Sequence, residues 1–579
     1  MDITQRFGRC IVGSSPTGGA KKTESFFRTR TAELYFFRRK NSEPVASLKF
    51  LTRNFKARPR FLLSFHIKNM ALNKYEIKKL DLPAEVINVI RTLKDKGFEA
   101  YLIGGCVRDL LLNRKPKDWD VTTNATPEEI ITLFKDTFYE NNYGTVGIVN
   151  EESKDETLKV IEVTPYRLEA EYSDNRRPDH VTFSKNLEDD LQRRDFTINA
   201  IALDVKENTK SKLKKSDIKF SGEYLDYYNG HEDLQAKIIR TVGEPHDRFT
   251  EDGLRILRAV RIATEIGFTI DKKTEKAIIT NASLLTNIAK ERIRDEFTKI
   301  IMSDNPMAGL ILCRKMGLIP YIAPKIESTV SIEQSRSHIY DVFEHSLHSL
   351  QHTADKKYPL ELRLAALFHD IGKPPTRRRD KEQDIWTFYG HEVTGAKIVA
   401  EILADLRFSK KVIEKVTKLV RWHMFFADTE QISLSAVRRI ISSVGRDNIW
   451  DLMNLRGADR MGMGRPKESP YRLRKYHSMV EEAMTDPVSV GMLKIDGAQV
   501  MKFTGEAPGP KIGYMLHALL EEMLENPALN TEEYLKKRAK ELGKLDANDL
   551  KKLGDSGKET KEKEEEKKIE EIRKKHWVK

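Results

Sequence analysis

The sequence predicts an α+β or α/β module followed by a mostly helical remainder, and three observations support this. Helical and strand patterns alternate between about residues 75 and 205. From about residue 233 onward the apolar residues recur at helical spacing. Of the 579 residues, 39% are hydrophobic and 33% are charged, with a mean hydropathy of −0.54, as in globular proteins of aqueous compartments. No stretch reaches the roughly 18–20 apolar residues that a membrane-spanning helix needs.

The first module contains recognisable starts and ends of its elements. Thr126 and Glu129 form a capping-box pattern with Pro127 at the first helical position, so a helix is expected at 126–136. Residues 86–97 have helical spacing, and short apolar runs predict strands at 99–105, 144–149 and 158–167.

The rest of the chain is expected to be helical with few interruptions. The helical segments are 251–267, 290–301, 360–372, 396–406 and 410–424. Pro374, Pro375 and the charged run at 377–384 indicate a loop. A further helical unit follows residue 485, and the charged end at 551–579 is expected to be a solvated helix or disordered.

The net charge of +13 lies almost entirely in residues 1–69, which hold 15 Lys/Arg and 4 Asp/Glu. The remainder carries only about +2, so contacts with a polyanion there require local basic patches. We expect residues 1–69 to be poorly ordered, either as an organellar transit peptide or as a stretch ahead of a functional start at Met70, which we favour. Only three cysteines are present (Cys10, Cys106 and Cys313), which excludes a disulfide framework and suits a reducing compartment.

The segment 101–130 is the most informative part of the chain. Gly104 and Gly105 end a strand and open a helix, a place where backbone N–H groups can bind phosphate oxygens. Arg108, one turn into that helix, can add a charge-assisted contact to the same phosphates. Asp118 and Asp120 alternate along a strand and therefore face the same side. Two neighbouring carboxylates repel each other unless a cation lies between them, and they are ligands that Mg²⁺ prefers.

Two later segments carry charges that suit a nucleotide. At 191–204, Arg193 and Arg194 can bind phosphates and Asp195 can accept a hydrogen bond from a ribose hydroxyl. At 251–261, Asp252 and Arg255 are spaced to share a helix face. A carboxylate accepts from the exocyclic amino group of cytosine or adenine, whereas uracil and guanine present a carbonyl there. One Asp–Arg pair could therefore select C and A.

The stretch from about 100 to 265 resembles the class II tRNA nucleotidyltransferase (CCA-adding) and bacterial poly(A) polymerase family. The matching motifs are GGCVRD, DWD, TNATPEEI, RRDFTINA and EDGLRILR, in the order of the family. The resemblance implies magnesium at the catalytic Asp118 and Asp120, with Glu162 as a further carboxylate. It implies nucleotide binding by Gly105, Arg108, Arg194, Asp195, Asp252, Arg255, Arg258 and Arg261. Residues 166–183, with Asp174 and 176–179, resemble the flexible loop used in switching from C to A.

A second set of residues suits a metal ion. His369 and Asp370 follow an apolar helical run, and His345, His391, His423 and Asp459 surround them in the sequence. Imidazoles and carboxylates from several helices can bind a divalent metal that activates water for phosphate-ester hydrolysis. The order resembles the HD phosphohydrolase superfamily, which implies His345, His369, Asp370 and Asp459 as ligands of a second divalent transition metal. His391 and His423 are candidate extra ligands, and Lys373 with 377–379 could hold RNA backbone.

These patterns and resemblances give one architecture: an α+β nucleotidyltransferase head with a mixed sheet, followed by an all-α neck, an HD domain and a tail. The predicted divisions are 1–69, 75–230 (head), 231–330 (neck), 335–465 (HD domain), 485–545 (tRNA-binding tail) and 551–579 (charged tail). The neck carries the base-reading helix.

The expected activity is addition of C, C and A to the 3′ end of tRNA from CTP and ATP, with release of pyrophosphate and with an HD phosphohydrolase as a second activity. The alternatives are a poly(A) polymerase, an enzyme that adds only CC or only A, and an HD phosphohydrolase with an RNA-binding head. The expected location is cytoplasmic, or mitochondrial or another organelle if residues 1–69 are a transit peptide. No membrane partner is expected, and the sequence gives no oligomeric state.

Overall fold

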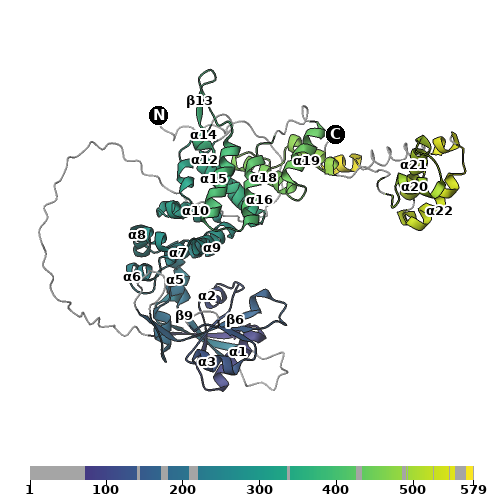
Figure 1. Cartoon of the computed structure of the whole chain (residues 1–579). Helices are drawn as coiled ribbons and strands as arrows, with labels where there is room; N and C mark the ends of the chain where they lie inside the picture. The colour runs from purple at the N-terminus through teal and green to yellow at the C-terminus, as the bar shows by residue number, and fades with distance from the viewer. Residues whose placement is uncertain are drawn as a thin grey trace, which may run out of the picture. The chain divides into compact units, whose positions relative to one another are not determined.

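The structure is a computed structural model (Figure 1). It describes residues 72–139, 144–170, 180–207, 220–334, 339–425, 433–484, 491, 493–525, 527–546, 548–553 and 569–577. The predictions for residues 1–69, for Asp174 and for 176–179 lie outside the described residues. In the part of the chain that is described, no helix is both long enough and apolar enough to cross a membrane.

The N-terminal part of the described chain is built on a mixed eight-stranded sheet with the strand order β1-β10-β9-β2-β3-β6-β5-β4. Its strands are β1 (Asn73–Leu80), β2 (Ala100–Ile103), β3 (Asp120–Thr123), β4 (Thr137–Tyr139), β5 (Val146–Val149), β6 (Val160–Pro165), β9 (Ile201–Glu207) and β10 (Phe220–Asp226). A separate hairpin joins β7 (Arg167–Ala170) and β8 (His180–Phe183). The helices are α1 (Ala84–Asp95), α2 (Gly105–Leu111), α3 (Pro127–Leu133) and α4 (Leu187–Gln192). The expected mixture of strands and helices is confirmed.

Local sequence signals explain several of these elements. Helix α3 begins after Thr126, whose side chain accepts from the backbone of Glu129 while the Glu129 side chain accepts from the backbone N–H of Thr126. This is the predicted capping box. Strand β3 pairs in parallel with β6, and Asp120 is the register partner of Glu162. Residues in register on neighbouring parallel strands project to the same face, so both carboxylates rise from one side of the sheet.

The chain then becomes helical, as predicted. The elements are α5 (Gly230–Ala236), α6 (Pro245–Glu251), α7 (Leu254–Ile266), α8 (Lys272–Asn281), α9 (Lys290–Met302), α10 (Pro306–Lys315) and α11 (Ile319–Ile322), with the short strands β11 (Ile238–Ile239) and β12 (Thr269–Ile270). Salt bridges connect this region to the head, for example between Lys117 and Glu265, whose charged atoms lie 3.1 Å apart.

A second helical region holds the predicted metal ligands. It contains α12 (Val342–Asp355), α13 (Leu360–Phe368), α14 (Lys373–Thr376), α15 (His391–Asp405), α16 (Lys410–Trp422), α17 (Leu434–Val444), α18 (Ile449–Gly462) and α19 (Tyr471–Met484). The expected loop at 377–384 is correct only in part: 381–384 form a turn, but β13 (Arg378–Asp380) pairs with β14 (Ile385–Thr387) to make a hairpin. Strands of three residues are too short to show a recognisable period in a sequence.

The C-terminal helices α20 (Gly497–Thr504), α21 (Pro510–Glu525) and α22 (Glu532–Leu542) share a hydrophobic core distinct from that of the preceding helices. Residues 569–575 are helical as well. This segment is not merely solvated: His576 Nε2 lies 2.7 Å from Glu481 on α19, and Arg573 contacts Glu482.

Candidate functional site

The turn between β2 and α2 is shaped by Gly104, which has a φ of 79°. A Cβ atom at this position would lie 3.0 Å from Oδ2 of Asp120 and 3.2 Å from Nη1 of Arg194. A side chain here would therefore be strained by its backbone angle and would crowd two charged groups. The missing side chain leaves room for a ligand at the first turn of α2.

The predicted carboxylate pair surrounds this turn. Oδ1 of Asp118 lies 3.7 Å from where a Cβ of Gly105 would be, and Oδ2 of Asp120 lies closer still, at 3.0 Å, to a Cβ at Gly104. Glu162 stands beside Asp120 on β6. Carboxylate oxygens gathered next to space that only glycine leaves open fit a hard divalent cation such as Mg²⁺. The structure thus brings together the residues that the sequence analysis assigned to magnesium.

Arg108 lies at the same turn and is nearly buried. Its Nε and Nη2 donate to Oδ1 of Asp109, and its Nη1 donates to Oδ1 of Asn199 at 3.0 Å. A guanidinium fixed on two sides keeps a definite position. Asn199 was not singled out by sequence reasoning.

Arg193 and Arg194 converge on the fully buried Asp190. Nη2 of Arg194 donates to Oδ2 of Asp190 at 3.1 Å, and Nε of Arg193 donates to Oδ1 at 2.9 Å. Burial would raise the pKa of Asp190, but the two guanidinium groups outweigh it and the pKa is lowered. Asp190 is therefore an anchor that holds Arg194 against the glycine turn.

Asp195 connects the head to helix α7. One of its oxygens accepts from Nδ2 of Asn199 at 3.0 Å, and the other accepts from Nε and Nη2 of Arg258 at 2.9 and 2.6 Å. Burial works to raise the pKa of Asp195, but Arg258 and Asn199 lower it well below its usual range. Asp195 in turn raises the pKa of Arg258. Two residues predicted to touch the nucleotide are thus each other's partners.

The expectation that Asp252 and Arg255 share a helix face is wrong. Helix α7 begins at Leu254, and Asp252 is an extended residue that ends α6. Asp252 pairs with Arg292 of α9, with Nη2 to Oδ2 at 2.8 Å. Arg255 donates instead to the carbonyl of Arg193 at 2.9 Å and to Glu251. No signal in the sequence marks Arg292, which lies 40 residues further along the chain.

Arg261 lies deeper along α7. It donates to Glu296 of α9 through Nε and to Glu265 through Nη1, at 2.5 and 2.7 Å. Both glutamates are largely buried. In these contacts Arg261 holds α7 against α9.

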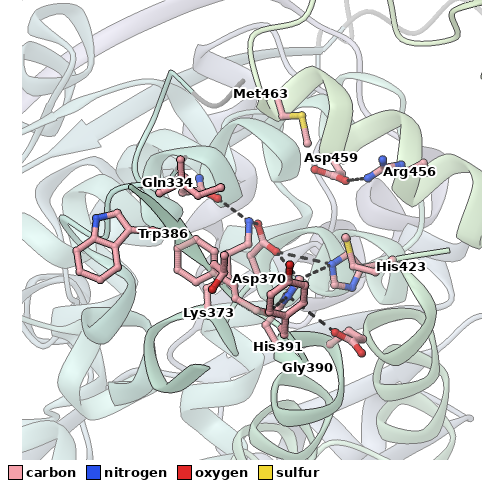
Figure 2. Close-up of a pocket in the computed structure, with 16 residues that line it drawn as sticks. Gln334, Asp370, Lys373, Trp386, Gly390, His391, His423, Arg456, Asp459 and Met463 are labelled. Carbon is pink, nitrogen blue, oxygen red and sulfur yellow. Dashed lines mark hydrogen bonds and ion pairs between the residues drawn. The ribbon is translucent and has the colours of Figure 1, made fainter. Parts of the chain in front are cut away.

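The second site is a buried cluster assembled from five helical segments. Figure 2 shows four of its members, Asp370, His391, His423 and Asp459. His345 lies on α12, His369 and Asp370 follow α13, His391 opens α15, His423 follows α16 and Asp459 lies on α18. All six side chains are buried. They fall into two groups whose donor atoms lie close together: His345, His369 and Asp459, and Asp370, His391 and His423.

Asp370 stands between the two groups. Its Oδ2 lies 3.3 Å from Nε2 of both His345 and His369. Its Oδ1 lies 3.3 Å from Nε2 of His391. The other carboxylate, Asp459, lies 3.2 Å from Nε2 of His345. The structure therefore unites the four predicted ligands with both extra histidines.

The ring nitrogens show what this cluster can bind. Nδ1 of His369, His391 and His423 lies 2.7–2.9 Å from the carbonyl oxygen three residues earlier. A carbonyl only accepts, so each Nδ1 carries a proton, and each ring in its neutral form offers a lone pair at Nε2. Nε2 of His391 and Nε2 of His423 face each other at 3.2 Å. When both rings are neutral, two lone pairs face each other at this distance and repel, and a cation between them removes the repulsion.

The negative charge of the cluster lies on its two carboxylates, and cationic groups surround them. Burial would raise the pKa of Asp370, but Lys373 and the neighbouring histidines lower it well below its usual range. Burial lowers the pKa of His345, yet Asp370 and Asp459 outweigh burial and raise it to about 9. Arg456 and His345 likewise outweigh burial and hold the pKa of Asp459 well below its usual range, so both aspartates are ionised, as carboxylate ligands of a metal must be.

Three family models match the chain. Residues 100–240 match the poly A polymerase head domain, 267–329 match the probable RNA and SrmB-binding site of polymerase A, and 342–451 match the HD domain. The last match ends before Asp459.

Curated relatives are named CCA-adding enzymes. That of Lactobacillus helveticus is 45% identical over 221 residues, 38% of this chain and 50% of the relative, so the match spans about half the length of that protein. That of Lactobacillus delbrueckii subsp. bulgaricus is 30% identical over 463 residues, 79% of this chain and 97% of the relative. Among solved structures, the Bacillus stearothermophilus CCA-adding enzyme in complex with CTP is 26% identical and covers 79% of this chain and 96% of its own, with a TM-score of 0.49.

Proposed function

The chain belongs to the family of CCA-adding enzymes, and on this premise we propose that it adds C, C and A to the 3′ end of tRNA. CTP and ATP are the substrates, pyrophosphate is the second product and no nucleic-acid template is used. The observation that carries this proposal is the glycine turn, where Asp118, Asp120 and Arg194 gather around space that a side chain would fill.

The residues at the turn suit nucleotidyl transfer. Arg194, anchored on Asp190, and Arg108, anchored on Asn199, orient the triphosphate, and the N-terminus of α2 faces its oxygens. Asp118 and Asp120 would hold magnesium, which would supply positive charge where the tRNA 3′-hydroxyl attacks the α-phosphate. The 3′-oxygen to phosphorus bond forms as the bond to the pyrophosphate oxygen breaks.

Base selection is assigned to the region where α6 meets α7. Asp252 offers a carboxylate that accepts from the amino group of cytosine or adenine and repels the carbonyl of uracil or guanine. In the structure Arg292 holds Asp252, and Arg255 is held by the backbone of Arg193 next to Asp195. The base-reading groups are therefore positioned by partners that lie outside the predicted pair.

We infer a second activity, metal-dependent hydrolysis of phosphate esters, at the buried cluster. Its support is the facing pair of Nε2 atoms on His391 and His423, together with Asp370, which reaches both groups of ligands. Six donors in two groups fit two divalent cations, with Asp370 between them. Such cations would supply a bound water of lowered pKa for attack on phosphorus.

The first proposal is tested with three tRNA transcripts that end at the discriminator base, at CC and at CCA. Each is incubated with magnesium and with CTP, ATP or both, and the products are separated at single-nucleotide length. We expect extension to CCA and no further.

Other patterns would identify the alternatives. A stop at CC, or a single A added only to the CC transcript, would assign a partial activity. A ladder of A would assign a poly(A) polymerase. If no transcript is extended, the remaining alternative is an HD phosphohydrolase with an RNA-binding head.

A further inference from the structure

The C-terminal helices α20–α22 have a hydrophobic core that is separate from the core of the helices before them. The smaller core runs from Leu493 to Leu550, whereas Tyr476 and Val480 of α19 belong to the larger one. Residues of one core pack against each other and hold their elements together. An apolar core common to both parts therefore does not hold α20–α22 to α19.

The chain returns to α19 after these helices. Residues 569–575 are helical, and Figure 1 shows this end of the chain beside α19. Nε of Arg573 donates to Oε1 of Glu482 at 3.0 Å. Nζ of Lys575 donates to Oε1 of Glu481 at 2.8 Å. The partners are 91 and 94 residues apart in the sequence, so both contacts join distant parts of the chain.

His576 is held by α19 through both its side chain and its backbone. Its Nε2 lies 2.7 Å from Oε2 of Glu481, and its carbonyl oxygen accepts from Nε of Arg474 at 3.2 Å. Its ring lies edge to face with that of His477, with 6.1 Å between the ring centres. Arg474, His477 and Glu481 are spaced to share one face of a helix. A single face of α19 therefore receives this segment.

The two glutamates of α19 are partly withdrawn from water. The Glu482 side chain is only 8% exposed, and it also accepts from Oγ of Ser478 at 3.3 Å. Burial would raise the pKa of Glu481, but Lys575 and His576 outweigh burial and the pKa is lowered. Salt screens such partly buried pairs less than fully exposed ones. The contact is therefore specific, although it consists of few groups.

The segment itself is amphipathic. Ile569, Ile572 and His576 are half-buried and spaced to share a helix face, whereas the other residues of 569–577 are exposed. An isolated helix shorter than about 12–15 residues is marginal in water. The contacts with α19 therefore stabilise the helical form of this segment.

We propose that residues 569–577 are a reversible strap, which docks on the face of α19 that carries Glu481 and Glu482. The occupant of this face is thus a segment of the same chain. Docking closes α20–α22 into a loop that is attached to α19 at both ends, and a closed loop has fewer accessible positions. The role in RNA binding rests on the function proposed above. Restricted helices lose less freedom when tRNA binds, so the docked strap strengthens tRNA binding.

Docking is measured in the full-length chain by the fluorescence anisotropy of a dye at position 579. The dye is attached to Lys579→Cys in a Cys10→Ser background, because Cys106 and Cys313 are buried. A free chain end moves within nanoseconds and gives a low anisotropy, whereas a docked end moves with α19. Raising NaCl from about 0.05 to about 0.5 M should lower the anisotropy, because salt screens the ion pairs.

Three neighbouring substitutions test the assigned contacts. Arg573→Glu and Lys575→Glu should each lower the anisotropy to the value at high salt, because each replaces an attraction to α19 with a repulsion. Lys574→Glu makes the same change in charge, but Lys574 is 73% exposed and pairs with Glu570 of its own helix. This control should keep the wild-type anisotropy. An Arg573→Glu chain that keeps the wild-type value would overturn the docking, as would an equal loss in all three variants.

The role in RNA binding has a separate readout, the dissociation constant for a tRNA transcript that ends at the discriminator base. Arg573→Glu should raise this constant about two- to tenfold, since a few partly exposed ion pairs limit the stability of the strap. Lys574→Glu should raise it less. Equal constants for the two variants would overturn the role in tRNA binding and leave the docking in place. A wild-type chain that binds no tRNA would contradict the proposed function, whereas the anisotropy result would stand.

Discussion

The two candidate sites of this chain position their charged groups in different ways. In the head and the helices that follow it, key functional residues are held by partners far away in the sequence, as Asp195 is by Arg258 and Asp252 by Arg292. In the buried cluster, three histidine rings are each oriented by the carbonyl three residues earlier on their own segment. The head therefore depends on the packing of several elements, whereas the rings of the cluster are oriented locally.

The strongest test of this comparison asks whether a substitution at one site leaves the activity of the other site unchanged. Asp120→Ala should lower CCA addition on the order of a thousandfold or more, because it removes one of the two carboxylates at the glycine turn. Hydrolysis of a phosphate ester at the cluster should be unchanged. The readouts are the tRNA extension ladder and release of phosphate. An Asp120→Ala variant that still extends tRNA would show that the active site has been placed wrongly.

The reciprocal variant removes a ligand of the cluster. We expect His423→Ala to lower the metal content from about two to about one cation per chain, because one of the two donor groups loses a member. Metal content is measured by mass spectrometry in an Asp118→Ala/Asp120→Ala background, so that the head does not contribute. Trp422→Phe at the adjacent position is the control. In the otherwise wild-type chain, His423→Ala should leave CCA addition intact, and an unchanged metal content would rule out the second cation position.

A smaller effect is expected on the discrimination between the four bases. Asp252→Ala should relax the rejection of UTP by about tenfold, since a good base-reading contact contributes roughly 1–3 kcal/mol. Arg292→Ala should have part of the same effect, because Arg292 holds the carboxylate. Single-nucleotide incorporation from each of the four triphosphates is the measurement. If both variants still exclude UTP as the wild type does, the base is read elsewhere.

The smallest expected effect concerns stability. Asp195→Asn should lower the free energy of unfolding by about 2 kcal/mol, because Arg258 loses its ionised partner. The Arg258 side chain is only 35% exposed, so water replaces that partner incompletely. The folded pKa of Asp195 is lowered, so its contribution is complete above its unfolded pKa of about 3.9 and is lost as the pH falls below that value. The variant should therefore show a flatter acid limb in urea unfolding between about pH 5 and pH 2. Parallel acid limbs would show that the pair contributes nothing.

The same contrast explains what the sequence could predict. The expectation that Asp118 and Asp120 alternate along one strand is wrong, because β3 begins at Asp120 and Asp118 lies in a bend before it. Both carboxylates still lie beside the glycine turn. The motif around His369 and Asp370 marks the cluster, and in the structure these two residues join the other ligands. The register between β3 and β6 and the pairing of Asp252 with Arg292 depend on contacts between distant segments, which periodicity does not report. Asp252 and Arg255 lie three residues apart, a spacing that predicts one shared helix. The break between α6 and α7 leaves the apolar pattern intact, so the sequence does not show it.

The local anchoring of the histidine rings has a consequence for the supply of metal. Proteins whose ligands assemble only around the ion unfold when it is removed. Here the rings are oriented by their own backbone, so stripping the metal should leave the fold in place and a different metal could be loaded afterwards. A site of imidazoles and carboxylates accepts several first-row cations, which differ in affinity in a fixed order. The identity of the working metal would then follow the pool of ions in which the protein folds, and one chain could contain different metals under different growth conditions.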